Sequence, residues 1–255
     1  MPNSEPTPAI QRTHLQQLAE YDTALLANLM RFVDTTPTHL WYMSNEIRAL
    51  LPDVGPTVGV AVTCELDTST PDDESDGNAD DFWTQLSQME AMDVPTVWVV
   101  KCVGSRPQHE CIMGDGMGKL LHAAGCVGAV TDGGLRDLPG LRTIGFAAYG
   151  SGVTIHHCNL RFRRINTPVD IGGITISPSD VIHANAEGVI RIPEAAVTKL
   201  ADRAPAYRAF EHDAHQLFRR TDITSAEKRP LTDAILKKHG FSDCLSTIEN
   251  EESGT

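Results

Sequence analysis

The spacing of hydrophobic residues changes several times along the chain and predicts alternating helices and strands. Apolar residues three or four positions apart predict an amphipathic first helix at 13–33, and further helical segments are predicted at 45–51, 82–92, 114–125, 139–144, 194–220 and 231–238. Runs rich in β-branched residues predict strands at 57–64, 96–103, 127–131 and 146–149. Between 153 and 192 short apolar runs are separated by Pro and Gly, which predicts several short strands. Helices on both sides of a β-rich centre indicate an α/β or α+β fold.

The length of 255 residues fits one large domain with terminal additions. The polar, Pro-containing start predicts a disordered N-terminus at 1–12, followed by the domain at 13–220 and a C-terminal extension at 221–255. Within the domain, residues 65–81 hold eight acidic residues and no basic one, which predicts a solvated surface loop.

Charge and cysteine usage narrow the class of protein. Asp and Glu number 34 against 21 Lys and Arg, for a net charge of −13. Because Lys and Arg supply most of the non-specific affinity for phosphates, this balance excludes a general nucleic-acid binder. The N-terminus lacks the pattern of a signal peptide, and no run approaches the roughly 18 apolar residues of a membrane span. The six cysteines are scattered without a CxxC pair, as is typical of reduced core thiols, so we expect a cytoplasmic protein with no membrane partner.

A glycine-rich loop opens the predicted helix at 114–125. The segment MGDGMGKL at 113–120 lacks the first Gly and the final Ser or Thr of a Walker A loop, and it lacks the last Gly of a dinucleotide fingerprint. Backbone N–H groups at the start of a helix nevertheless provide a general site for a carboxylate or phosphate. A turn chosen only for tight packing explains the same glycines equally well.

A second turn places two opposite charges side by side. Arg136 and Asp137 follow the predicted strand at 127–131 in the segment TDGGLRD. Arg136 can hold a carboxylate or an enolate oxygen through its fork of donors. Asp137 can hold a hard divalent cation such as Mg²⁺. Together they could bind opposite ends of an α-keto acid, although an Arg–Asp surface pair is the more common explanation in an arbitrary protein.

The combination of the two turns resembles the RraA-like family. Asp115, twenty further residues and then Arg136-Asp137 form a D-x20-R-D pattern, and the similarity covers about residues 20–215. It includes PTVGVAVT, GDGMGKLLHAAGCVGAVTDGGLRD and INTPVDIGGITISPSDVIHANAEGVIRIP. Within the family the chain resembles the divalent-metal-dependent 4-hydroxy-4-methyl-2-oxoglutarate / 4-carboxy-4-hydroxy-2-oxoadipate aldolases. It departs from the family pattern at Ser179, where a turn glycine is usual, and at 185–188, where NAEG replaces Asp-x-Asp-Gly.

The resemblance implies a role for each residue of the pattern. Arg136 would bind the pyruvyl group and stabilise its enolate oxygen, and Asp137 would ligate Mg²⁺ or Mn²⁺ directly. Asp115 would contact the metal through a water close to the reacting hydroxyl. Glu211 would be an acid supplied by a neighbouring subunit. The backbone amides that would hold the substrate carboxylate are those of Gly116, Met117, Gly118, Lys119 and Leu120.

The resemblance also implies a fold and a reaction. The fold is a layered β/β/α unit of the swivelling, phosphohistidine-domain-like type with a helical C-terminal extension, assembled as a homotrimer or hexamer. The reaction is metal-dependent cleavage of a 4-hydroxy-2-oxo acid to pyruvate, with oxaloacetate decarboxylation as a side activity because it yields the same enolate. The family also includes a non-enzymatic regulator that binds and inhibits a ribonuclease. In such regulators Gly tends to occupy the position of Asp115, so Asp115 favours the enzyme.

Histidines and arginines between 156 and 164 have simpler explanations. His156 and His157 are adjacent, and neighbouring strand residues face opposite sides, so we expect surface or partly buried imidazoles and not a metal pair. Arg161, Arg163 and Arg164 could attract an anionic substrate, although a solvated strand face is the more common explanation.

Overall fold

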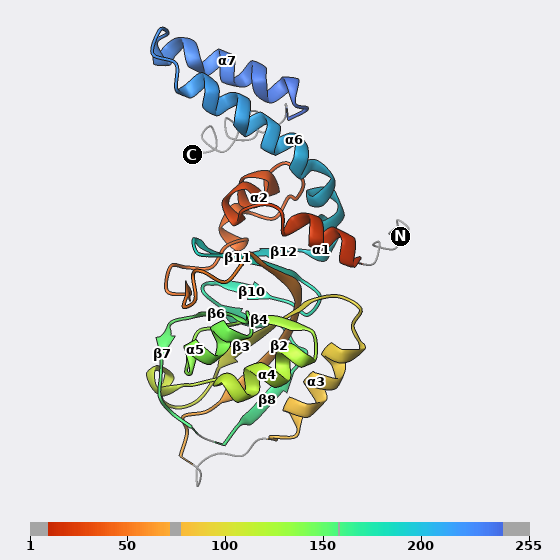
Figure 1. The fold of residues 1–255 in the computed structure, drawn as a ribbon, viewed down its shortest axis with the longest axis vertical. Coiled ribbons are helices and arrows are strands. Elements are labelled where there is room, and N and C mark those ends of the chain that lie inside the picture. Colours follow the sequence, from red (N-terminus) through yellow and green to blue (C-terminus); the bar gives the residue numbers. More distant parts are fainter. Residues whose placement is uncertain (1–9, 72–77, 158, 242–255) are drawn as a thin grey trace, which may run out of the picture.

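A mixed β-sheet forms the centre of the protein (Figure 1). The computed structural model describes residues 10–71, 78–157 and 159–241. Within these residues the sheet has eight strands in the order β1-β6-β4-β3-β2-β11-β12, and β8 pairs with the C-terminal end of β2. Strands β2, β3, β4 and β6 are mutually parallel, whereas β1, β8, β11 and β12 pair antiparallel to their neighbours. The strands are β1 (Arg48–Ala49), β2 (Thr57–Asp67), β3 (Thr96–Cys102), β4 (Cys126–Thr131), β6 (Ala147–Gly150), β8 (Arg161–Ile165), β11 (Val181–Asn185) and β12 (Gly188–Ile192).

Successive side chains of the central strands enter two different buried layers. Trp98 and Val100 of β3 pack with side chains of α3, α4 and α5, whereas Val97 and Val99 pack with the hairpin of β9 and β10. Because both faces are covered, β2 and β3 are almost continuously apolar in sequence. The covering elements are α3 (Asp81–Ala91), α4 (Asp115–Ala123), α5 (Leu138–Thr143), β9 (Val169–Ile171) and β10 (Ile174–Ile176). The protein therefore has the layered β/β/α fold that the resemblance implied.

The segment predicted as one helix at 13–33 contains two helices. The Asp22 carboxylate accepts a hydrogen bond at 2.7 Å from the N–H of Leu25 and caps α2 (Thr23–Met30), so the chain turns after α1 (Arg12–Leu18). The prediction was wrong here because a local capping interaction interrupts an otherwise continuous apolar spacing. Most of the predicted disordered start, residues 1–9, lies outside the described residues.

The helix predicted at 45–51 is also wrong, because this segment contains the short strand β1. The N–H of Leu50 donates to the carbonyl of Ala148 at 2.8 Å, and β1 pairs with β6. A short segment that ends at Pro52 can form too few helical hydrogen bonds to be stable by itself. Its backbone instead forms hydrogen bonds with β6 at the edge of the sheet.

The acidic stretch at 65–81 begins inside the sheet and not on the surface. Strand β2 runs through Asp67, and Asp67, Thr68 and Ser69 are all buried. Residues 72–77 lie outside the described residues. The predicted solvated loop therefore starts later than the charge pattern indicated.

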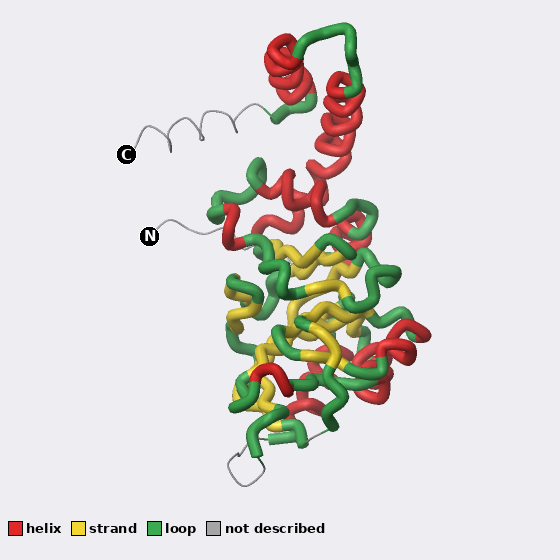
Figure 2. The backbone as a smooth tube through the Cα atoms, turned by 90° about the vertical axis from the view of Figure 1, so that its left-hand side faces the viewer, coloured by secondary structure: helices red, strands yellow, loops and turns green. Residues whose placement is uncertain are grey.

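Two helices, α6 (Glu194–Phe218) and α7 (Ser225–Lys238), project from one end of the sheet as a hairpin (Figures 1 and 2). The first half of α6 packs on α1 and α2 through Leu200 and Ala204. Helix α7 starts earlier than the predicted 231–238, because Thr224 and Glu227 form a capping box. No helix in the described part of the chain is long and apolar enough to cross a membrane.

Candidate active site

The glycine-rich loop directs the first turn of α4 toward a cavity. Gly114 caps the helix with extended backbone, and the N–H of Gly118 donates to its carbonyl at 3.0 Å. The amides that precede Gly118 have no carbonyl one turn earlier in the helix, so they point out of its positively polarised end. Gly116, Met117 and Leu120 line the cavity, whereas Gly118 and Lys119 are not among its lining residues. Of the predicted positions 116–120, Gly116 and Met117 therefore both belong to the open first turn of α4 and line the cavity.

Arg136 and Asp137 lie on the connection between β5 (Gly134–Leu135) and α5. Asp137 has a left-handed backbone, with φ of 57°, a conformation that Asp adopts more readily than most residues. Its carboxylate makes no capping hydrogen bond to α5. Instead Oδ2 lies 3.6 Å from Nε of Arg136. The turn thus presents both charged groups on the side of α4.

Backbone hydrogen bonds hold the two motifs together although they are far apart in sequence. The N–H of Ile112 donates to the carbonyl of Gly134 at 3.0 Å, and the N–H of Arg136 donates to the carbonyl of Met113 at 3.1 Å. Cys111 forms a parallel β-bridge with Gly134. This pairing fixes the start of α4 beside the Arg136-Asp137 turn.

Each of the two carboxylates lies against a glycine of the other motif. A Cβ placed on Gly114 would overlap Oδ2 of Asp137 and lie 3.0 Å from Nε of Arg136. A Cβ placed on Gly140 would lie 2.6 Å from Cβ and 2.7 Å from Oδ2 of Asp115. These distances are too short for real contacts, so a side chain at either position would displace the carboxylate that lies against it.

The motifs form one wall of a cavity of about 600 Å³. Asp115, Arg136 and Asp137 line it together, which places the three residues of the D-x20-R-D pattern at one site. His156 and His157 also line it. The sequence predicted surface or partly buried imidazoles, and both are exposed, but no pattern indicated that they border this cavity. The pairing of β5 with β7 (Gly152–Val153) holds the chain that precedes them beside the Arg136-Asp137 connection.

Asp115 is the more strongly paired of the two carboxylates. The Lys119 Nζ donates to Oδ2 of Asp115 at 2.7 Å from one helical turn away. This hydrogen bond lowers the pKa of Asp115 below its ordinary value, and the positive charges of Lys119 and Arg136 add to the effect. Asp115 is therefore ionised at neutral pH and can accept a proton or hold a water.

The donor set fits a hard divalent cation. Mg²⁺ and Mn²⁺ prefer carboxylate oxygens, and Mg²⁺ commonly takes only one or two protein carboxylates and keeps several waters. Asp137 offers a half-exposed carboxylate that lies 3.6 Å from Nε of Arg136, and Asp115 stands on the neighbouring helix α4. Within the described residues no group of three or more His, Cys, Asp or Glu side chains is arranged to hold a metal ion.

Glu211 does not reach this cavity within one chain. It lies on α6 in the projecting hairpin, whereas α4 and α5 lie toward the other end of the molecule (Figure 1). Its carboxylate accepts a long hydrogen bond of 3.4 Å from Nδ2 of Asn28. A role for Glu211 at the site thus requires another copy of the chain, as the resemblance implied.

The chain belongs to the RraA-like family. The family model, described as Aldolase/RraA, matches residues 29–191 and therefore includes both motifs of the site.

Two curated relatives match parts of the chain. A Halalkalibacterium halodurans protein named "Putative 4-hydroxy-4-methyl-2-oxoglutarate aldolase" is 36% identical over 80 residues, which are 31% of this chain and 37% of that protein. Protein DlpA of Legionella pneumophila is 28% identical over 119 residues, or 41% of this chain and 19% of that protein. The matches thus span about a third and about a fifth of these relatives.

Solved structures share the fold at low sequence identity. An uncharacterized protein of Pseudomonas syringae has a TM-score of 0.66 and 20% identity, over 91% of this chain and 99% of that one. Streptomyces coelicolor RraAS2, described as an unusual member of the RNase ES inhibitor RraA family, has a TM-score of 0.61 and 22% identity, over 85% of this chain and all of that one. These similarities support the layered fold.

Proposed function

We propose that the protein is a divalent-metal-dependent carbon–carbon lyase that cleaves a 4-hydroxy-2-oxo acid to pyruvate, with oxaloacetate decarboxylation as a side activity. The observation that carries this proposal is the presence of Asp115, Arg136 and Asp137 on one cavity at the start of α4. The name of the Halalkalibacterium relative agrees with it.

The chain's own residues account for substrate binding. The open amides of the first turn of α4 hold the C1 carboxylate, because the positive end of the helix favours an anion there. The Arg136 guanidinium donates to the 2-oxo oxygen. Asp137, with Asp115 through water, would hold Mg²⁺ or Mn²⁺. When bound, the cation would withdraw electrons from the 2-oxo group.

Bond cleavage then needs one proton acceptor and one anion stabiliser. Asp115 accepts the proton of the C4 hydroxyl through a water, and the C3–C4 bond breaks as C4 becomes a carbonyl. The bonding electrons pass to the pyruvate enolate, whose oxygen is held by Arg136, and C3 then takes a proton from water. A preorganised donor at a developing negative charge is commonly the largest contribution to catalysis.

The proposal includes a homotrimer or hexamer. Val153 and Ile155, in the segment that leads to His156, are 67% and 91% exposed, and burial against a second copy would remove this apolar surface from water. Such an arrangement would also allow the Glu211 of a neighbouring subunit to approach the site.

The test is a screen of 4-hydroxy-2-oxo acids and oxaloacetate for pyruvate release, with Mg²⁺ or Mn²⁺ and after chelation. We expect turnover that requires the metal and that is lost in Arg136→Ala. A ribonuclease regulator would instead bind and inhibit a ribonuclease and release no pyruvate from any of these acids.

A further inference from the structure

His156 and His157 are polar residues of the candidate active site to which the proposed reaction has given no role. Both are exposed, and both line the cavity that contains Asp115, Arg136 and Asp137. Neither imidazole has a hydrogen bond or an ion pair to any residue that the structure describes. Because imidazole commonly gives and takes protons near neutral pH, this pair could carry out a proton transfer in the reaction.

The backbone holds these histidines close to Arg136. Strand β7 pairs in parallel with β5 and places Val153 opposite Leu135, the residue directly before Arg136. The N–H of Thr154 donates to the carbonyl of Leu135 at 3.0 Å and extends this pairing by one residue. The two chains therefore leave the strand pair side by side, one into Arg136 and the other into His156, two residues after Thr154.

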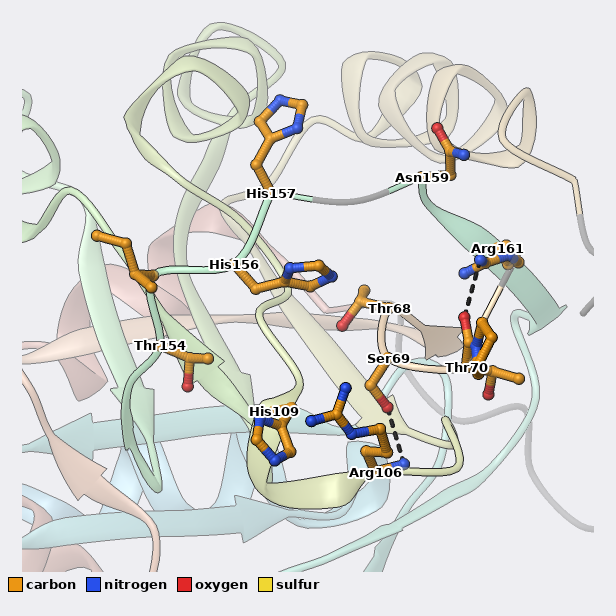
Figure 3. Close-up of a pocket in the computed structure, with 12 residues that line it drawn as sticks. Thr68, Ser69, Thr70, Arg106, His109, Thr154, His156, His157, Asn159 and Arg161 are labelled. Atoms are coloured by element: carbon orange, nitrogen blue, oxygen red, sulfur yellow. Dashed lines mark hydrogen bonds between the residues drawn. The ribbon is translucent and has the colours of Figure 1, made fainter. Parts of the chain in front are cut away.

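The two imidazole rings point in different directions, as expected for adjacent residues of an extended chain. Figure 3 shows a second cavity, of about 650 Å³, which shares both histidines with the cavity of the candidate active site. The His156 ring points into this second cavity toward Thr68, whereas the His157 ring points away from Thr68. His157 is therefore the imidazole that remains available to the candidate active site.

Formation of pyruvate requires a proton donor as well as a proton acceptor. When the C3–C4 bond breaks, the electron pair passes to the enolate, and C3 becomes a methyl group only after it gains a proton. Asp115 accepts the proton of the C4 hydroxyl, but its lowered pKa makes it a poor group to hold that proton for C3. Arg136 does not give up a proton in proteins, and Asp137 is the proposed metal ligand.

The remaining titratable side chain of this cavity is closed to a substrate. Cys111 is buried, and its Sγ lies 3.8 Å from the carbonyl of Met113. The described residues that line the cavity include no Lys, Tyr or Glu. The two imidazoles are therefore the lining groups that can supply a proton to C3.

We propose that His157 is the catalytic acid that protonates C3 of the pyruvate enolate. This rests on the proposed function, because it takes the cavity as the site of the 2-oxo acid. The N–H bond of the imidazolium breaks as the enolate electron pair forms the new C3–H bond, and the neutral imidazole then takes a proton from water. The proton accepted at Asp115 returns to the solvent. Water thus remains the source of the methyl proton, and His157 delivers it.

The test follows the exchange of the pyruvate methyl protons, which requires proton transfer at C3 but no cleavage of a carbon–carbon bond. Pyruvate, Mg²⁺ and the protein are incubated in D₂O, and the methyl signal is followed by proton NMR. We expect exchange by the unaltered protein and a rate about 100-fold lower or less in His157→Gln, since a positioned acid or base commonly contributes this much. Pyruvate affinity, from calorimetric titration with Mg²⁺ present, should be unchanged, because His157 acts only on the proton of C3.

Two further variants make the result specific to the imidazole. In His157→Gly, imidazole added to the solution should restore part of the exchange, since the free base can enter the space that the side chain leaves. His109→Gln removes a histidine that lines the second cavity but not the cavity of the candidate active site, and it should exchange at the unaltered rate.

Exchange at the unaltered rate in His157→Gln would overturn the proposal, including the case in which His156→Gln is the slow variant. Slow exchange that is explained by weaker pyruvate binding and is not restored by imidazole would also overturn it, because a merely structural role gives that result. Failure of the proposed reaction gives a different signature. No pyruvate would then be released from any 4-hydroxy-2-oxo acid, although the unaltered protein exchanges the methyl protons and His157→Gln does not.

Discussion

The carboxylate of Asp137 occupies the space that a side chain at Gly114 would need. This contact links the loop before α4 to the turn before α5, and it makes the position of the candidate metal ligand depend on a glycine more than twenty residues earlier in the chain.

We therefore expect Gly114→Ala to displace the Asp137 carboxylate. The Mg²⁺ concentration for half-maximal pyruvate release should rise about tenfold or more, the usual effect of disturbing a residue that orients a metal ligand. The measurement is a metal titration of activity, with circular dichroism to verify folding. Gly152→Ala is the matched control, because a Cβ there would meet no atom within 4 Å. An unchanged metal requirement in Gly114→Ala would contradict the expectation that the contact between Gly114 and Asp137 positions the metal ligand.

Replacement of Arg136 tests whether this residue stabilises the enolate oxygen. Arg136→Ala should lower kcat/KM by about 100-fold or more for every 2-oxo acid that the protein turns over, because the enolate oxygen loses its fixed donor. Arg142→Ala provides a control, since this arginine is half-exposed and pairs with Asp53 on the surface. Retention of full turnover in Arg136→Ala would remove this residue from the mechanism.

The pH dependence of the reaction tests Asp115. The hydrogen bond from Lys119 lowers the pKa of Asp115, so the ionised form persists to lower pH than for an ordinary Asp. In Lys119→Met this support is lost, and the acidic limb of the kcat/KM profile should move to higher pH. Lys199→Met, on the exposed side of α6, should leave the profile in place. An acidic limb that stays at the same pH in Lys119→Met would contradict a role for ionised Asp115.

His183 provides a separate prediction for stability. Burial lowers its pKa to about 4, and its ring lies 2.9 Å from Oγ1 of Thr23 and 3.2 Å from the carbonyl of Leu18. Since the folded pKa is below the unfolded value of about 6.5, the stabilising contribution is complete above pH 6.5 and is lost as the pH falls toward 4. The free energy of unfolding should decline by up to roughly 1.4 kcal/mol per pH unit in this window because of His183.

Urea denaturation between pH 4 and 7.5 measures this slope. His183→Gln should be less stable at neutral pH and should lose part of the decline on acidification, whereas His39→Gln, at an exposed position, should keep it. Parallel curves for the unaltered protein and His183→Gln would show that His183 is not the group responsible.

Local signals in the sequence predicted the central strands, α4 and the residues of the candidate site. That these elements bring the site residues together could be predicted only from the resemblance to the family. No local pattern in the sequence shows that the backbone of Met113 pairs with that of Arg136. The two wrong helix predictions have identifiable physical causes. The Asp22 cap divides the first predicted helix into two, and residues 48–49 pair with β6 at the edge of the sheet instead of forming a helix. The burial of Glu110 and Asp67 could not be predicted locally, because the donors to Glu110 come from Thr68 and Ser69 and the ion-pair partner of Asp67 is Arg163, all distant in sequence.

Asp115 lies against Gly140, and Asp137 lies against Gly114. Because each segment limits the side chains that the other can carry, we expect the two segments to change together in evolution. A chimaera that takes only the 113–120 segment or only the 134–140 segment from a relative with different residues at these four positions should lose the site, while one that takes both should keep it. Natural relatives that alter one of these glycines should carry a matching change on the opposite segment.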